Sequence, residues 1–213
     1  MQVLSNLNED EPDEKQGVFN TLSFIENLVS IDPKLTESFI TKTTLLFWLL
    51  ERISVQTFDS VRQYSSELLA IFFQESRPNR LKLIEYNGVE TILQILSVYR
   101  KKDPEDADEI EMMENLFDCV CSCLHEPEIK HAFLISEGLE LMLVMIREKK
   151  MSRIRAFKVI DHALTGNESQ ELAHRFIEIL GLKTLFAAFM KKGIKAFKKQ
   201  YSAFSETAEE GKI

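Results

Sequence analysis

Residues 84–96 read IEYNGVETILQIL, and two further segments of the chain repeat their pattern. These segments are LISEGLELMLVMI at 134–146 and IEILGLKTLFAAF at 177–189. In each of them an apolar residue is followed four positions later by glycine, then by Val or Leu and by paired apolar positions. A weaker copy, ITKTTLLFWLL at 40–50, has Thr44 at the glycine position. Self-similarity of this kind is typical of repeat architectures, in which each unit packs against its neighbours.

The copies also keep a regular interval along the chain. The glycine position is held in turn by Thr44, Gly88, Gly138 and Gly181, at intervals of 44, 50 and 43 residues. A proline stands just before the short first helix of three units, at Pro33, Pro78 and Pro127. The interval fits the period of about 40–47 residues of armadillo and HEAT repeats, and a long third helix favours armadillo. We therefore predict an all-α fold, an armadillo-like helical-repeat right-handed solenoid of about four units.

Apolar residues at helical spacing place the expected helices within this scheme. The expected helices cover residues 17–30, 35–41, 45–53, 58–74, 79–86, 89–100, 111–124, 129–136, 139–148, 151–164, 171–180 and 182–191. Residues 1–16 are expected to be an acidic N-terminal lead-in, residues 17–192 the armadillo-like repeat domain, and residues 193–213 a charged C-terminal tail.

Composition limits the classes of function. The 213 residues carry a formal net charge of −8, which argues against direct nucleic-acid binding because phosphate contacts need a surplus of Lys and Arg. An acidic surface instead favours basic partners. The longest apolar run, LLFWLL at 45–50, is much shorter than the roughly 20 residues of a membrane helix. We expect a soluble intracellular protein with no membrane association and no small-molecule substrate.

Five segments resemble the central armadillo repeats of the beta-catenin-like protein 1 family. They are GVFNTLSFIENLVSIDP (17–33), YSSELLAIFFQ (64–74), EMMENLFDCVCSCL (111–124), EGLELMLVMIREKKMSRIRAFKVIDHAL (137–164) and FIEILGLKTLFAAFMK (176–191). The resemblance implies a non-enzymatic nuclear scaffold of the pre-mRNA splicing machinery, without cofactors. It also implies binding of basic, nuclear-localisation-like segments of splicing-factor proteins in the Prp-nineteen-type complex. Because the resemblance covers only residues 15–192, properties of the family's flanking portions are not transferred.

Armadillo third helices line a concave surface on which extended peptides lie. Asn amides can pair with a peptide backbone there, and carboxylates can bind Lys and Arg side chains. The candidate peptide-binding groove comprises the polar residues of the expected third helices: Asn20, Asn27, Glu67, Gln74, Glu111, Glu114, Asn115 and Asp118. The tryptophan ladder of importin-type proteins is absent, because Trp48 falls in a second helix. The acidic run at 103–114 also has a plainer interpretation as a solvated loop and helix start, where carboxylates suit the helix dipole.

The expected helix at 111–124 also carries Cys119, Cys121 and Cys123, which invite other interpretations. Their spacing fits neither a zinc site nor a disulfide framework. Cys121 and His125 could touch on a helix, as in a thiolate pair, and a cysteine-dependent enzyme is therefore the main alternative. Burial in the core is the plainer interpretation, since cysteine is among the most often buried residue types.

Two further alternatives concern the rest of the chain. The chain could be a purely structural part of a larger helical-repeat assembly, in which case exposed apolar ends are expected. Basic residues also cluster at one helix junction, where they are either solvated or in contact with RNA or acidic protein. They are Arg147, Lys149, Lys150, Arg153, Arg155 and Lys158.

Overall fold

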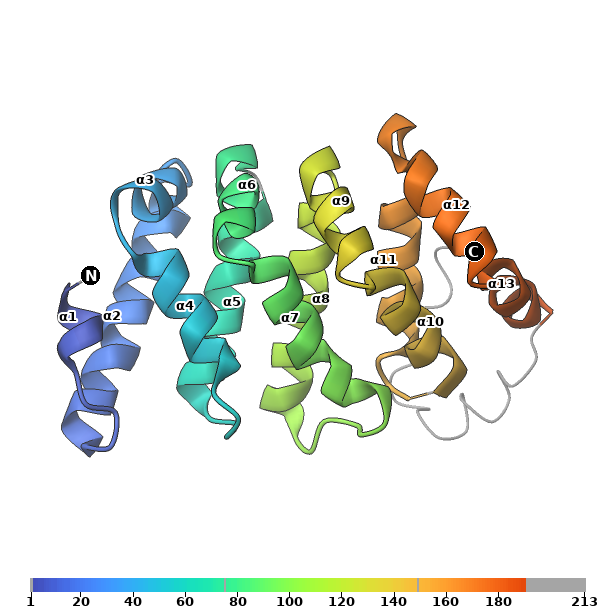
Figure 1. Ribbon diagram of the computed structural model, residues 1–213. Coiled ribbons are helices and arrows are strands. Elements are labelled where there is room, and N and C mark those ends of the chain that lie inside the picture. Colours follow the sequence, from blue (N-terminus) through green and yellow to red (C-terminus); the bar gives the residue numbers. More distant parts are fainter. Residues whose placement is uncertain (1, 75, 149, 191–213) are drawn as a thin grey trace.

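The computed structural model describes residues 2–74, 76–148 and 150–190, and the tail expected at 193–213 lies outside them. The described residues form thirteen α-helices and two short 3₁₀ segments, η1 (Ser97–Arg100) and η2 (Asn167–Ser169), without a β-strand. The helices stack along one direction from the N-terminal to the C-terminal end (Figure 1). The predicted all-α helical-repeat solenoid is therefore confirmed.

The helices fall into three sets that follow the repeat. The first helices are short: α3 (Leu35–Lys42), α6 (Arg77–Glu85), α9 (Pro127–Ile135) and α12 (Gln170–Glu178). The second helices are α4 (Leu45–Ser54), α7 (Gly88–Leu96), α10 (Gly138–Glu148) and α13 (Gly181–Phe189). The third helices are α2 (Pro12–Ile31), α5 (Ser60–Gln74), α8 (Ala107–Cys123) and α11 (Arg153–Leu164). A short helix, α1 (Gln2–Asn6), precedes them.

The third helices form one layer, behind the first and second helices in the view of Figure 1. Within this layer α2 packs on α5, α5 on α8, and α8 on α11. A single hydrophobic core runs through the stack, from Leu4 in α1 to Phe176 in α12. Neighbouring units therefore share their apolar surface, as expected for a solenoid.

The glycine of the repeat has a packing reason. A Cβ atom at Gly138 would lie 2.3 Å from the Phe133 ring, and one at Gly181 would lie 2.4 Å from the Phe176 ring. At Gly88 the neighbour is the Leu83 side chain, at 2.2 Å. In three of the four units, a large apolar residue of the first helix thus packs on the start of the second helix, at a distance that leaves no room for a side chain.

The residue before each of these glycines makes the turn between the first and second helices. Asn87, Glu137 and Leu180 have φ angles of 52°, 55° and 60°, in the left-handed region. This conformation is disfavoured for L-amino acids other than glycine and, to a lesser degree, asparagine. The left-handed residue of the turn is therefore not the glycine of the repeat but the residue before it. The glycine is required by the close packing at the start of the second helix.

The largest difference from the predicted boundaries lies in α2, which begins at Pro12 and not at Gly17. Proline suits the first turn of a helix, where its missing N–H leaves no hydrogen bond unmade. Asp13 and Glu14 in the same turn stabilise the helix, because their negative charges interact favourably with the positive end of the helix dipole. Part of the expected acidic lead-in therefore belongs to the first long helix.

Both ends of the described stack expose large apolar side chains. On α2, Phe24 and Ile31 are 62% and 83% exposed, and on α13 Phe186 and Phe189 are 59% and 73% exposed. No helix of the described part of the chain combines the length and the apolar character needed to cross a bilayer.

Candidate protein-interaction surface

The predicted groove residues all lie on third helices. Asn20 and Asn27 are on α2, Glu67 and Gln74 on α5, and Glu111, Glu114, Asn115 and Asp118 on α8. Each of these side chains is exposed or half-buried. Because α2, α5 and α8 are neighbours in one layer, residues far apart in the sequence share one face. Their role in binding stays a prediction.

Three carboxylates, one from each of three successive third helices, form what we call the acidic row: Glu26 of α2, Glu67 of α5 and Glu111 of α8. Burial raises the pKa of Glu67, and the charges of Glu26 and Glu111 raise it further. Within the described residues, no Lys, Arg or His forms a salt bridge with any of the three. The acidic row is therefore a concentration of negative charge that the fold itself does not neutralise.

Two aromatic residues border the acidic row. The Tyr64 hydroxyl donates a hydrogen bond to Glu26, and burial together with this bond raises the pKa of Tyr64 to about 12. The Tyr64 ring packs against Phe19, with 4.9 Å between the ring centroids. Phe19 is 36% exposed, so an apolar surface lies next to the carboxylates. Such a surface can cover the methylene stem of a bound Lys or Arg.

Two further carboxylates of α8, those of Glu114 and Asp118, have partners on α11. Arg155 Nη2 lies 2.9 Å from Glu114 Oε1, and Arg155 Nη1 lies 3.5 Å from Asp118 Oδ1. Lys158 Nζ donates to Asp118 Oδ1 at 3.0 Å. We call these contacts the α8–α11 ion pairs. Glu114 and Asp118 of α8 are thus neutralised by two members of the basic cluster, a pairing that the sequence does not show.

Three of the predicted amide residues, Asn20, Asn27 and Asn115, make side-chain hydrogen bonds. The Asn27 side chain donates to the Ser23 carbonyl oxygen at 2.8 Å, and the Asn20 side chain accepts from Gln16 at 3.0 Å. Asn115 Nδ2 donates to Ser66 Oγ at 3.3 Å and thereby connects α8 with α5. Each of these amides keeps further hydrogen-bonding capacity, since a primary amide offers two donors and one carbonyl acceptor.

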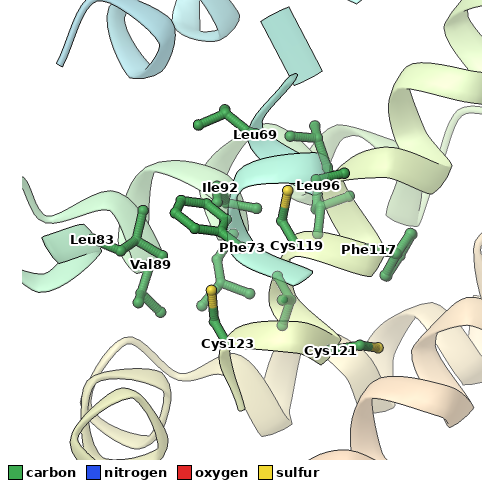
Figure 2. Packing of buried hydrophobic residues seen from close by; sticks show 14 of the residues in the cluster. Leu69, Phe73, Leu83, Val89, Ile92, Leu96, Phe117, Cys119, Cys121 and Cys123 are labelled. Carbon is green, nitrogen blue, oxygen red and sulfur yellow. The ribbon is translucent and has the colours of Figure 1, made fainter. Parts of the chain in front are cut away.

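The three cysteines are buried core residues. Cys119 and Cys123 point toward Phe73 and Ile92, and Cys121 points the other way, toward α11 (Figure 2). Burial raises the pKa of all three thiols, that of Cys121 to about 12. They therefore remain protonated at neutral pH, whereas a nucleophilic cysteine needs a lowered pKa and partial exposure.

His125 is not placed as a base for Cys121. Its Nδ1 atom lies 2.9 Å from the Ser122 carbonyl oxygen, and its ring contacts His162, with 5.3 Å between the ring centroids. Burial, and then the neighbouring His125, lower the pKa of His162. In the part of the chain that the structure describes, no three metal-ligating side chains come together in a group that could hold an ion.

Glu26 is the functional candidate that the sequence reasoning missed. It lies on α2 three residues after Ser23 and directly before Asn27. Of this helix, the predicted groove included only the amides Asn20 and Asn27. The helical spacing alone was enough to include it.

Comparison with known proteins defines the family. A sequence model of the family described as "Catenin-beta-like, Arm-motif containing nuclear" matches residues 1–211. The chain belongs to this catenin-beta-like family. "Beta-catenin-like protein 1" of Homo sapiens and that of Bos taurus are each 46% identical to the chain over 193 residues, which cover 90% of the chain and 34% of the relative. "Beta-catenin-like protein 1 homolog" of Schizosaccharomyces pombe is 40% identical over 191 residues, 89% of the chain and 34% of the relative.

The catenin-beta-like family agrees with the resemblance found in the sequence. Its Arm motifs identify a protein-interaction scaffold, and proteins of this kind are generally non-catalytic. The chain spans about a third of the length of the curated relatives that it matches, 34% in each case.

Proposed function

We propose that the chain is a non-enzymatic scaffold of the nuclear pre-mRNA splicing machinery. Its third-helix face would bind basic, nuclear-localisation-like segments of splicing-factor proteins, such as those of the Prp-nineteen-type complex. Membership of a family described as nuclear supports the location. The acidic row is the observation that carries the binding mode.

Three properties of the acidic row favour a basic ligand. First, its carboxylates come from three neighbouring helices, so a ligand can contact several of them only by lying across the layer. Second, burial and then the charges of Glu26 and Glu111 raise the pKa of Glu67, so its charged form is disfavoured, and a bound cation would favour it. Third, the half-buried position of Glu67 makes its attraction to a cation stronger than that of a fully solvated carboxylate.

A disordered basic segment loses conformational freedom when it binds, so we expect moderate affinity. The affinity should fall as salt rises, because the contacts are between charges close to the surface.

The direct test is fluorescence anisotropy with a labelled Lys/Arg-rich peptide at low salt and at about 150 mM salt. We expect the Glu67→Gln/Glu111→Gln variant to bind at least about tenfold more weakly than the natural chain, from two lost charge contacts. Glu85→Gln/Glu105→Gln is the matched control. It removes two charges from exposed residues outside the third helices, and we expect a change below about twofold.

The splicing assignment needs a second readout. The immobilised chain should retain splicing proteins from nuclear extract, and Glu67→Gln/Glu111→Gln should retain markedly less of them. Peptide binding that is undetectable, or equally weakened by the control variant, would overturn the binding mode. If the natural chain and Glu67→Gln/Glu111→Gln retain the same proteins equally well, the splicing association does not depend on the acidic row.

A further inference from the structure

The α8–α11 ion pairs lie beside the acidic row. Glu111, a member of the row, and Glu114, a member of the ion pairs, are one helical turn apart on α8. Both therefore lie on the same side of that helix, since residues three apart are neighbours on a helix surface. The side chains of the ion pairs are between 28% and 48% exposed, so a ligand on the third-helix layer can reach them.

Arg155 and Lys158 carry the same charged groups as the ligand of the proposed function. The guanidinium of Arg155 contacts both Glu114 and Asp118, and the ammonium of Lys158 contacts Asp118. A ligand Lys or Arg that approached these carboxylates would first have to displace an internal cation held at 2.9–3.5 Å. The ligand would also meet the repulsion of that cation.

We propose that Arg155 and Lys158 are internal competitors that restrict basic ligands to the part of the layer formed by α2, α5 and α8. In this arrangement the acidic row determines where the ligand binds, and α11 limits how far the ligand extends toward the C-terminal end. Arg155 and Lys158 are thus specificity-determining residues that lower affinity. This inference rests on the proposed function.

The size of the effect follows from the exposure of the ion pairs. Partly exposed pairs are weak, and removing both internal cations should free two carboxylates for the ligand. We expect a gain in affinity of about threefold to tenfold. The gain should require Glu114 and Asp118, because these are the carboxylates that the change makes available.

The experiment measures binding of the Lys/Arg-rich peptide to Arg155→Gln/Lys158→Gln. The matched control is Lys82→Gln/Lys102→Gln, which also removes two positive charges and two ion pairs, with Glu85 and Glu105. Both variants therefore change the net charge equally. We expect a higher peptide affinity for Arg155→Gln/Lys158→Gln, which we call the α11 variant. For the control we expect a change in affinity below about twofold.

A second variant locates the gain on the surface. Adding Glu114→Gln and Asp118→Asn to the α11 variant should return the affinity to that of the natural chain. In the natural chain, Glu67→Gln/Glu111→Gln should weaken binding.

The outcomes separate the two proposals. Equal affinity of the natural chain and Arg155→Gln/Lys158→Gln, or an equal gain in the control, would overturn the internal competition and leave the acidic row intact. A gain that persists after Glu114→Gln and Asp118→Asn are added to Arg155→Gln/Lys158→Gln would overturn it too. Absence of peptide binding by every variant would overturn both the competition and the proposed function.

Discussion

Arg80 of α6 and Glu126, the residue before α9, form a buried ion pair between successive first helices. Arg80 Nη2 lies 2.7 Å from Glu126 Oε1, and the two side chains are only 12% and 6% exposed. Arg80 also donates to the carbonyl oxygens of Phe73 and Gln74, at the end of α5. One guanidinium therefore joins the end of a third helix to the next two first helices.

The variant Glu126→Gln should destabilise the fold. It would leave the buried guanidinium of Arg80 without a counter-charge, and we expect the free energy of unfolding to fall by about 2–3 kcal/mol. Urea denaturation followed by circular dichroism measures this change. Glu128→Gln is the control. The Glu128 side chain is 49% exposed and pairs with Arg77 at 3.2 Å. Loss of this exposed pair should lower the free energy of unfolding by less than about 0.5 kcal/mol. Equal effects of the two variants would contradict the structural role of the buried pair.

Alanine at Gly138 should destabilise the chain although alanine is the better helix former. Its Cβ would lie 2.3 Å from the Phe133 ring, and overpacking of this kind costs about 1–3 kcal/mol. The comparison is Gly17→Ala within α2, where the nearest atom, of Leu7, would be at an ordinary 3.5 Å. There we expect a gain of about 0.5–1 kcal/mol. The midpoint temperature of thermal unfolding should therefore fall for Gly138→Ala and rise for Gly17→Ala.

Asparagine at position 180 should stabilise the chain. Leu180 has a φ angle of 60° and is 61% exposed, so its left-handed conformation is strained and its side chain contributes little packing. Asparagine tolerates this conformation, as at Asn87, and we expect a gain of about 0.5–1 kcal/mol in the free energy of unfolding. Ile177→Asn, at a 54% exposed position within α12, is the control and should give no gain.

The cysteine thiols should be nearly inert in the folded chain. At pH 7.5, alkylation by iodoacetamide should be at least about a hundredfold slower than for free cysteine, because burial raises the thiol pKa values, that of Cys121 to about 12. In denaturant all three should react readily. A thiol that reacted faster than free cysteine at pH 6 would instead support the cysteine-enzyme interpretation.

Binding of the basic peptide should weaken on mild acidification. The pKa of Glu67 is raised from its ordinary 4.5, so Glu67 gains a proton, and loses its charge, at a higher pH than an exposed glutamate does. On acidification the affinity should therefore begin to fall at a higher pH than it would for a site made of exposed glutamates. Glu67→Gln should bind more weakly at pH 7 and show a flatter pH dependence. An affinity that falls only where an exposed glutamate is protonated would contradict the raised pKa of Glu67.

The repeat could be predicted from the sequence because its determinants are local. The glycine and the apolar positions around it recur at a fixed spacing, and the structure places Gly88, Gly138 and Gly181 at the start of successive second helices. The pattern did not identify the contact that requires the glycine. The large side chains of Leu83, Phe133 and Phe176 contact it from five residues earlier, one position before the repeated segment begins.

The charges on the third-helix layer were harder to predict because their pairing depends on register. Asp118 and Lys158 are 40 positions apart, and they meet only because α8 and α11 lie side by side at one particular offset. The loops between the helices set this offset, and no periodicity in the chain encodes it. The sequence therefore located the acidic residues on the right helices without showing which of them are neutralised.

The acidic row also sets a period for its ligand. Axes of packed helices lie about 8–10 Å apart, and an extended chain advances about 3.3 Å per residue. A peptide that crosses the layer of α2, α5 and α8 therefore passes one carboxylate for about every three of its residues. Under the proposed function, we expect a partner whose Lys and Arg residues are separated by small or polar residues and are not consecutive. An uninterrupted basic run would bring excess cations toward Arg155 and Lys158.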